Sequence, residues 1–392
     1  MTGAQVPQPA EWHIITCEYP PSIGGVSDYT FTLASALGAV GPVHVWCPVS
    51  VGSAPVARNV VVHAELRSFS RRELGRLERR LDATKSPRRL FVQWVPQGYG
   101  YRSVNLGFAM WLASRVRRQR DQLHLMVHEP FLPWSVKPLH LGASLLHRAM
   151  LATASARATR VWLSTQTWRD YVRPYVPSRT PVEWLPVPAP PVAVELTCAA
   201  PTTDAPAPNP TPSVGHFGMH SSLVTRMLEP ALDVLLERTR ATVLLIGRDS
   251  DTFRDAFVRA RPHAAPRVKA TGVLTLEAAA QAMRRCDVMV QPYPDGVTAR
   301  RTSTLAALSL GLPVVTNAGH LTEDFWKDCG AVLLAPSADG RLVGESAAAL
   351  LTDSIGRASL AVRAKDFYDR RFAPRHAAAM LTAAAWPPRH AA

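Results

Sequence analysis

Apolar positions in the first half of the chain form short continuous runs separated by stretches with helical spacing. Trp12–Cys17 reads WHIITC, and after a Pro/Gly turn Tyr29, Leu33 and Leu37 follow at i, i+4 and i+8. A second run, Val43–Cys47, begins about 30 residues after the first, which is the length of one strand–helix–strand unit. This spacing predicts parallel strands joined by helices.

The same alternation continues through both halves of the chain. In the first half, further buried strands are predicted at Leu90–Trp94, Leu123–Val127 and Val161–Ser164. In the second half, strands are predicted at Val214–Phe217, Thr242–Ile246, Asp287–Gln291, Pro313–Thr316 and Ala331–Leu334, with helices at Leu223–Arg238 and Thr304–Leu310. The pattern predicts an α/β chain with two doubly wound, open parallel sheets.

A proline-rich stretch, Leu185–Ser213, separates the two halves and cannot form regular secondary structure. We therefore predict a first domain over residues 1–190, a linker over 191–212 and a second domain over 213–374. The alanine-rich tail, residues 375–392, is predicted to be helical. A length of 392 residues agrees with two domains.

Charge and cysteine content narrow the classes of function. The chain carries a net charge of +14, nearly all from arginine, which favours anionic partners such as phosphate-bearing molecules, anionic membranes or nucleic acid. The five cysteines are widely spaced without a C-x-x-C pair, so neither a disulfide framework nor a zinc site is predicted. No signal peptide or membrane-spanning run is evident, so a cytoplasmic protein, at most peripheral on a membrane, is expected.

Two motifs carry a family resemblance. Glu18–Leu37 reads E-Y-P-P-x-x-G-G-V-x-x-Y-x-x-x-L-A-x-x-L, and its paired glycines, Gly24 and Gly25, precede a helix start, where backbone N–H groups bind anions. Together with Asp287–Gly296 and Leu305–Val315, this motif resembles glycosyltransferase family four, retaining enzymes of the GT-B fold. The resemblance implies two Rossmann-like domains facing a central cleft, a nucleotide-diphosphate sugar as donor, no metal, and a terminal helix that returns to the first domain.

The donor motif departs from the family pattern. The resemblance places two glutamates at Thr298 and Ala306, but neither position is acidic. The sequence offers Asp295–Ser303 (DGVTARRTS) instead. Asp295 is predicted to orient the sugar, and Arg300 or Arg301 to clamp the diphosphate. Gly296, Thr302 and Ser303, near a helix start, complete this group; an exposed Arg-Arg turn with an ordinary cap is the alternative.

The loop after Val214–Phe217 is a second candidate for donor binding. The family commonly places an arginine and a lysine there, and this chain has no lysine at that point. Gly218, Ser221 and their backbone N–H groups are predicted to contribute, with His220 as a side-chain donor.

Acceptor contacts are predicted from loops of the first domain. His128 follows a central strand and corresponds to a histidine that the family keeps near the reacting sugar, so the resemblance assigns it to the catalytic group with Asp295 and Arg300. Glu129 is either an acceptor-orienting group or a helix cap. Tyr99 and Tyr29 are predicted on the acceptor side, although such rings either stack on sugars or pack in a core.

Other readings remain open. Asp249-Ser-Asp251 matches a metal-binding signature, but no further ligand accompanies it, so a surface turn is expected. A sugar-nucleotide epimerase and a non-catalytic sugar-nucleotide binder are alternatives to the transferase. The basic run Arg67–Arg89 is either a solvated helix face or a contact with an anionic membrane, and no nucleic-acid motif accompanies it. Acceptors include saccharides, natural products and lipid-linked saccharides.

Overall fold

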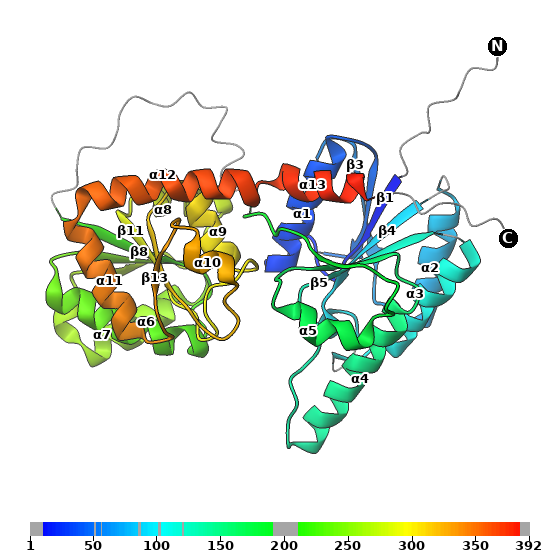
Figure 1. Ribbon diagram of the computed structural model, residues 1–392, viewed down its shortest axis with the longest axis horizontal. Coiled ribbons are helices and arrows are strands. Elements are labelled where there is room, and N and C mark those ends of the chain that lie inside the picture. Colours follow the sequence, from blue (N-terminus) through cyan, green and yellow to red (C-terminus); the bar gives the residue numbers. More distant parts are fainter. Residues whose placement is uncertain are drawn as a thin grey trace, which may run out of the picture. The chain divides into compact units, whose positions relative to one another are not determined.

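The computed structural model describes residues 11–50, 52–55, 57–84, 88–100, 103–119, 121–190 and 211–384. The chain divides into two compact units, which we describe separately (Figure 1). The first comprises the chain up to Val187 together with the segment from Pro374, and the second runs from Pro188 to Ala373. Most of the predicted linker, residues 191–210, lies outside the described residues.

The first unit is built on a parallel sheet whose strand order is β3-β2-β1-β4-β5-β6-β7. The strands are β1 (Glu11–Ile15), β2 (Val43–Pro48), β3 (Val60–Leu66), β4 (Arg88–Trp94), β5 (Gln122–Val127), β6 (Arg160–Leu163) and β7 (Val182–Trp184). The helices are α1 (Gly25–Gly38), α2 (Arg71–Asp82), α3 (Leu106–Gln119), α4 (Pro138–Ser155), α5 (Trp168–Val172) and α13 (Pro374–Ala383).

Helix α13 belongs to the first unit although it comes last in the chain. Ala377, Ala378 and Leu381 are buried in one apolar cluster with Leu33 and Leu37 of α1. Burial of these small and aliphatic side chains stabilises the attachment of the C-terminal segment to the first unit.

The second unit repeats this architecture. Its parallel sheet has the order β10-β9-β8-β11-β12-β13. The strands are β8 (Ser213–Phe217), β9 (Thr242–Ile246), β10 (Val268–Ala270), β11 (Val288–Gln291), β12 (Val314–Asn317) and β13 (Leu333–Ala335). The helices are α6 (Ser222–Arg238), α7 (Ser250–Ala260), α8 (Leu276–Arg284), α9 (Thr302–Ser309), α10 (Asp324–Asp328), α11 (Gly340–Thr352) and α12 (Ser354–Arg371). The prediction of two doubly wound domains is confirmed.

Three strands were missing from the sequence prediction: β3, β7 and β10. Each lies at the edge of its sheet. An edge strand is buried less completely, so its residues need not be uniformly apolar, and β7 and β10 are also only three residues long.

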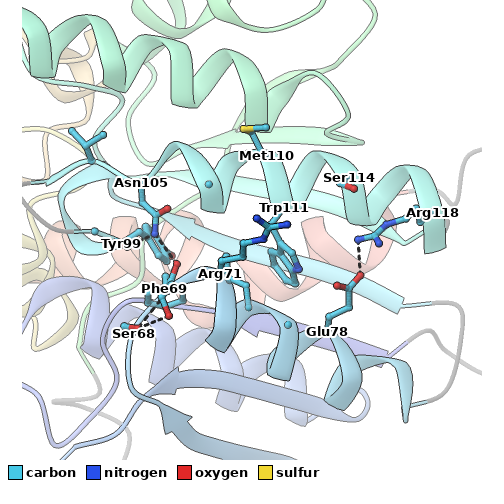
Figure 2. A pocket seen from close by; sticks show the side chains of 16 residues that line it. Ser68, Phe69, Arg71, Glu78, Tyr99, Asn105, Met110, Trp111, Ser114 and Arg118 are labelled. Atoms are coloured by element: carbon cyan, nitrogen blue, oxygen red, sulfur yellow. Dashed lines mark hydrogen bonds and ion pairs between the residues drawn. The ribbon is translucent and has the colours of Figure 1, made fainter.

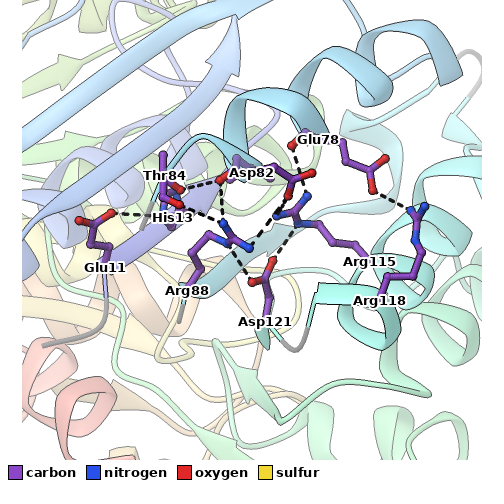
Figure 3. A network of polar contacts seen from close by, with 10 residues as sticks. Glu11, His13, Glu78, Asp82, Thr84, Arg88, Arg115, Arg118 and Asp121 are labelled. Carbon is purple, nitrogen blue, oxygen red and sulfur yellow. Dashed lines mark hydrogen bonds and ion pairs between the residues drawn. The ribbon is translucent and has the colours of Figure 1, made fainter. Parts of the chain in front are cut away.

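A buried ionic network lies near the amino ends of β4 and β5, on the opposite edge from the loops discussed below (Figure 3). Asp121 accepts hydrogen bonds from Arg88 Nε at 2.9 Å and Arg115 Nε at 2.8 Å, and all three side chains are at most 5% exposed. Arg115 also reaches Asp82 at 3.0 Å, while Arg88 Nη1 donates to the carbonyl of Leu81 at 2.9 Å. The network therefore ties the end of α2 to α3 and β4.

Buried histidines predict a loss of stability in acid. His13 and His124 each accept a hydrogen bond from a tryptophan indole through Nδ1, so these rings are neutral. Burial lowers the pKa of His13 to about 2, and the pKa values of His124 and His216 to about 3. Because the unfolded chain takes up these protons near pH 6.5 and the folded chain does not, stability is full above pH 6.5 and falls on acidification.

We expect each of these histidines to cost about 2 kcal/mol of unfolding free energy between pH 7 and pH 5. Urea unfolding at the two pH values measures the loss. His124→Gln should reduce the pH dependence, because it removes one of these buried groups. Equal pH dependence in wild type and His124→Gln would contradict the assignment.

Candidate functional site

A pocket of about 280 Å³ lies at the carboxyl ends of β8 and β11 in the second unit. The strand order reverses between these two strands, and open parallel sheets bind ligands at such a switch point. The polar residues that line the pocket are His216, Ser221, Gln291, Arg300, Arg301, Thr302 and Ser303. Most of the predicted donor-binding residues are thus brought together.

The loop after β11 is held rigidly by β12 and the segment that follows it. Asn317 Oδ1 accepts from the backbone N–H of Tyr293 at 2.8 Å, and its amide donates to the Tyr293 carbonyl at 2.8 Å. The buried carboxylate of Glu323 accepts from the N–H of Ala299. Gly296 has φ +87°, and a Cβ there would lie 2.1 Å from Thr322 Oγ1, so only glycine fits this turn.

The two predicted clamp arginines share one carboxylate. Arg300 Nη2 lies 3.3 Å from Asp295 Oδ2, and Arg301 is paired with Asp295 Oδ1. The guanidinium of Arg301 also lies 4.4 Å from the centre of the Tyr293 ring. All three charged side chains are about one-fifth exposed. Asp295 therefore acts as the counter-ion of both arginines, a role that differs from the sugar contact predicted for it.

Helix α9 begins directly after the arginines. Tyr293 Oη lies 2.8 Å from both Ser303 Oγ and Thr304 Oγ1, which fixes the first turn of the helix to the end of β11. Thr302 and Ser303 line the pocket at this helix start. The arginines and the positive end of α9 together favour an anion in the pocket.

Across the pocket, the loop after β8 supplies Gly218 and Ser221. Gly218 has φ +148°, and its carbonyl packs so closely on Gly247 that a Cβ at Gly247 would lie 2.4 Å from it. The loop therefore depends on two glycines. Ser221 is the N-cap residue of α6, so its position agrees with the predicted helix start.

His220 differs from its prediction as a donor. Its Nδ1 lies 3.1 Å from the carbonyl oxygen of Arg248, so Nδ1 carries the proton and donates it there. Burial lowers the pKa of His220, which keeps the ring neutral. The remaining nitrogen, Nε2, is then a lone pair and accepts hydrogen bonds instead of donating them to a phosphate.

Two polar residues of the pocket were missed from the sequence. Gln291 is fully buried at the end of β11, and neither its carbonyl nor its amide has a hydrogen-bond partner. His216 donates through Nδ1 to the Val290 carbonyl at 2.8 Å and leaves Nε2 without a partner. The sequence signal that could have identified Gln291 is a polar residue at the carboxyl end of an otherwise apolar strand. Both groups offer hydrogen bonds to a ligand.

In the first unit, His128 lies at the carboxyl end of β5 as predicted. Its Nε2 lies 2.7 Å from Oε1 of the buried Gln93, at the end of β4. The edge of the Tyr29 ring packs against the imidazole, with 4.9 Å between ring centres. Tyr29 is 2% exposed, so its ring packs against His128 and has no accessible face for an acceptor.

The remaining predicted acceptor residues differ from one another. Glu129 is exposed and accepts a hydrogen bond from the Gln97 side chain, so these two loops meet at the surface. Tyr99 is 2% exposed, its hydroxyl donates to the Gln93 carbonyl at 2.5 Å, and its ring stacks on Phe108. Tyr99 therefore belongs to the core and presents no face for stacking on a sugar.

The glycine pair lies at the start of α1, beside a carboxylate of the same loop. The carboxylate of Glu18 accepts hydrogen bonds from the N–H groups of Val26 and Ser27 at 3.1 and 3.0 Å. A Cβ on Gly24 would lie 2.4 Å from this carboxylate, whereas Gly25 faces open space. A negative charge therefore already lies at this helix start, and the diphosphate contact of Gly24 and Gly25 stays a prediction.

The positions of the missing family glutamates are both buried. Ala306 lies inside α9, and Thr298 is fully buried with a hydroxyl that has no hydrogen-bond partner. Asp249 precedes α7 in a left-handed conformation (φ +62°), and Asp251 lies in the first turn of that helix. Within the described ranges, no three His, Cys, Asp or Glu residues are placed to hold a metal.

A wider pocket of about 980 Å³ lies on the first unit, between α2 and α3 (Figure 2). Its walls combine aromatic and aliphatic side chains, among them Phe69, Met110 and Trp111, with Arg71 and an ion pair of 2.7 Å between Glu78 and Arg118. The sequence did not indicate this pocket, because its residues come from three separate segments.

The fold and the pocket at the switch point define a protein with the GT-B fold, built from two Rossmann-like domains. Residues 213–353 match the family described as "Glycosyl transferases group 1". The chain therefore carries a glycosyltransferase group 1 domain, and this domain contains the pocket described above. No curated protein sequence matches the chain.

Solved structures with the same fold are similar to the chain over nearly its whole length. Sucrose-phosphate synthase from Thermosynechococcus elongatus is 15% identical, with a TM-score of 0.69 and coverage of 95% of this chain and 97% of that one. Anabaena HepE in complex with UDP and glucose is 14% identical, with a TM-score of 0.64 and coverage of 95% and 98%. WaaG, a glycosyltransferase involved in lipopolysaccharide biosynthesis, is 15% identical, with a TM-score of 0.64 and coverage of 95% and 100%.

Proposed function

We propose that the protein is a retaining glycosyltransferase of family four that transfers a sugar from a nucleotide-diphosphate sugar to an acceptor hydroxyl. The observation that carries the proposal is the pairing of Arg300 and Arg301 with the start of α9 in a pocket at the switch point. Two guanidinium groups and a helix N-terminus are suited to a diphosphate. HepE, whose structure contains UDP and glucose, shares this fold.

In the proposed reaction, the acceptor hydroxyl attacks the anomeric carbon on the face from which the diphosphate departs. The bond from the anomeric carbon to the phosphate oxygen breaks, and that phosphate oxygen takes the hydroxyl proton. Arg300 and Arg301 stabilise the negative charge that develops on the leaving diphosphate. His128, held by Gln93, orients the reacting sugar. No protein nucleophile takes part, and no metal is required.

The acceptor is proposed to bind on the first unit. His128, Glu129 and Gln97 lie on its carboxyl edge, and the pocket of about 980 Å³ between α2 and α3 opens beside loops of the same edge. Its mixture of aromatic walls and arginines suits a saccharide, a natural product or a lipid-linked saccharide.

A screen of UDP-, GDP-, ADP- and TDP-sugars by thermal shift tests donor binding, and release of free nucleotide diphosphate tests turnover. We expect stabilisation by one of them, acceptor-dependent release that survives EDTA, and a product with the donor's anomeric configuration by NMR. Formation of an epimerised nucleotide sugar would contradict the proposed transfer and show that the protein is an epimerase. Binding without turnover would leave a non-catalytic binder, and no binding at all would refute the donor site.

The role of Asp295 gives a separate prediction. If Asp295 is the counter-ion of both arginines, a bound diphosphate competes with it. Asp295→Asn should then bind the sugar-free nucleotide diphosphate several-fold more tightly, because the competing charge is removed while the side-chain size is kept. Isothermal titration calorimetry measures the change. Unaltered affinity would instead favour the original prediction that Asp295 contacts the sugar.

A further inference from the structure

The first turns of helix α4 present apolar side chains to solvent. Leu139, Leu145 and Leu146 are 85%, 52% and 42% exposed, and Leu141 is 39% exposed. Just before the helix, Val136 is 98% exposed and Trp134 is 59% exposed. We call these six residues the α4 patch. Together they expose on the order of several hundred Å², as much as the largest apolar patch on a typical soluble monomer.

Three polar residues of α4 lie on its inner side, whereas His140 in its first turn is exposed. Ser144 Oγ donates to the Leu132 carbonyl at 2.9 Å, and His147 Nε2 lies 2.6 Å from the Ser103 carbonyl oxygen. Ser144, His147 and Arg148 are all buried. The usual pattern of a surface helix, apolar inside and polar outside, is therefore reversed in the first turns of α4.

The exposed loop before α4 is fixed to the helix by one arginine. The guanidinium of Arg148 lies 3.9 Å from the centre of the Phe131 ring and 3.8 Å from that of Trp134. Its Nη1 also donates to the Leu132 carbonyl at 3.1 Å. These contacts hold Trp134 in place at the surface, so the packing of the first unit fixes its position in the α4 patch. Figure 1 shows the first turns of α4 extending past α5.

The charge around the α4 patch is positive. No aspartate or glutamate occurs in residues 130–169, a stretch that contains the whole patch, whereas Lys137 lies within it and is exposed. In the basic run Arg67–Arg89, Arg76 pairs with Glu73, Arg80 with Glu65 and Arg88 with Asp121. Other arginines of this run, among them Arg71 and Arg79, are exposed.

We propose that the α4 patch docks the protein on an anionic membrane surface, with the leucines and Trp134 inserted at the level of the lipid headgroups. Apolar side chains gain free energy by entering the acyl boundary, and tryptophan prefers this interface. The ammonium group of Lys137 beside the patch interacts favourably with anionic lipids. A second copy of the chain would bring Lys137 against a like charge, so lipid is the better occupant.

Docking through this patch is an interfacial contact. None of the described helices is both long and apolar enough to cross a membrane. The inference is independent of the proposed transferase activity, because it rests on exposure, side-chain contacts and charge in the first unit alone. It names a surface for the predicted membrane contact that differs from the basic run Arg67–Arg89.

Sedimentation of the full chain with phosphatidylcholine vesicles, with and without about one third phosphatidylglycerol, tests the proposal. We expect binding to the anionic vesicles, and a loss of at least about tenfold in the Leu139→Glu/Leu146→Glu variant, because both side chains leave the interface and two anionic charges are added. Both positions are exposed, so the variant should fold.

The matched control is Ile355→Glu/Val362→Glu on α12. It makes the same kind of substitution at two apolar residues that are 82% and 70% exposed. This control should bind vesicles like the wild type. In addition, brominated lipids should quench the fluorescence of the wild type more than that of Trp134→Phe. Absent vesicle binding by the wild type, or equal losses in both double variants, would overturn the proposal. A dimer abolished by Leu139→Glu/Leu146→Glu would assign the patch to self-association instead.

Discussion

Replacing Arg301 with alanine is expected to weaken binding of the nucleotide-diphosphate sugar by about 10- to 100-fold, since a hydrogen bond between charged groups contributes about 1.5–3 kcal/mol. Arg300→Ala should have an effect of the same order, and the double variant a larger one. Arg301 is the better placed of the two, because Tyr293 and Asp295 already fix its guanidinium. Calorimetric titration with the donor found in the nucleotide-sugar screen measures each affinity.

Arg79→Ala is the control, because Arg79 is an exposed residue of α2 in the other unit. Its donor affinity should equal that of the wild type. Arg301→Lys should restore only part of the binding, because an ammonium group cannot form the paired hydrogen bonds of a guanidinium. Equal losses in Arg79→Ala and Arg301→Ala would show that the effect is one of net charge and not of a diphosphate clamp.

The second large effect concerns stability. Asp121→Ala should lower the unfolding free energy of the first unit by about 3–5 kcal/mol, because it leaves the buried guanidinium groups of Arg88 and Arg115 without their shared carboxylate. Urea unfolding followed by tryptophan fluorescence measures the change, since the unit contains buried tryptophans such as Trp46 and Trp94.

Asp82→Ala provides the comparison for Asp121. The side chain of Asp82 is 40% exposed and pairs with the same Arg115. Its loss should cost about 1 kcal/mol or less, since water screens and replaces the contact. Equal unfolding free energies for Asp82→Ala and Asp121→Ala would contradict the prediction. The network would then stabilise the unit through packing and not through its buried charge.

Much of the fold follows from local patterns. Runs such as Val43–Cys47 and Thr242–Ile246 are apolar because parallel strands in the middle of a sheet are covered on both faces, and they lie where they were predicted. The missed strands β3, β7 and β10 lack this signal, because an edge strand pairs on one side only. Central strands are therefore visible in the sequence, whereas among the edge strands that the structure describes only β13 was predicted.

Part of the candidate site was visible in the same way. Arg300, Arg301 and Thr302 were found because they follow a buried strand and precede a helix, and the structure places all three around one pocket. Gln291 was missed because a single glutamine at a strand end is also common in ordinary packing. Its burial without a hydrogen-bond partner is a property of the folded chain alone.

The sequence by itself determined the two doubly wound sheets and the loops that carry polar residues, because periodicity and turn chemistry are local. Only the tertiary structure decided which charges meet. It placed Glu18 at the start of α1, where a phosphate contact was predicted, and Asp295 between the two arginines. It also left the leucines in the first turns of α4 exposed to solvent. Spacing along the chain predicts an element, but the direction of each side chain depends on which neighbours the fold packs against it.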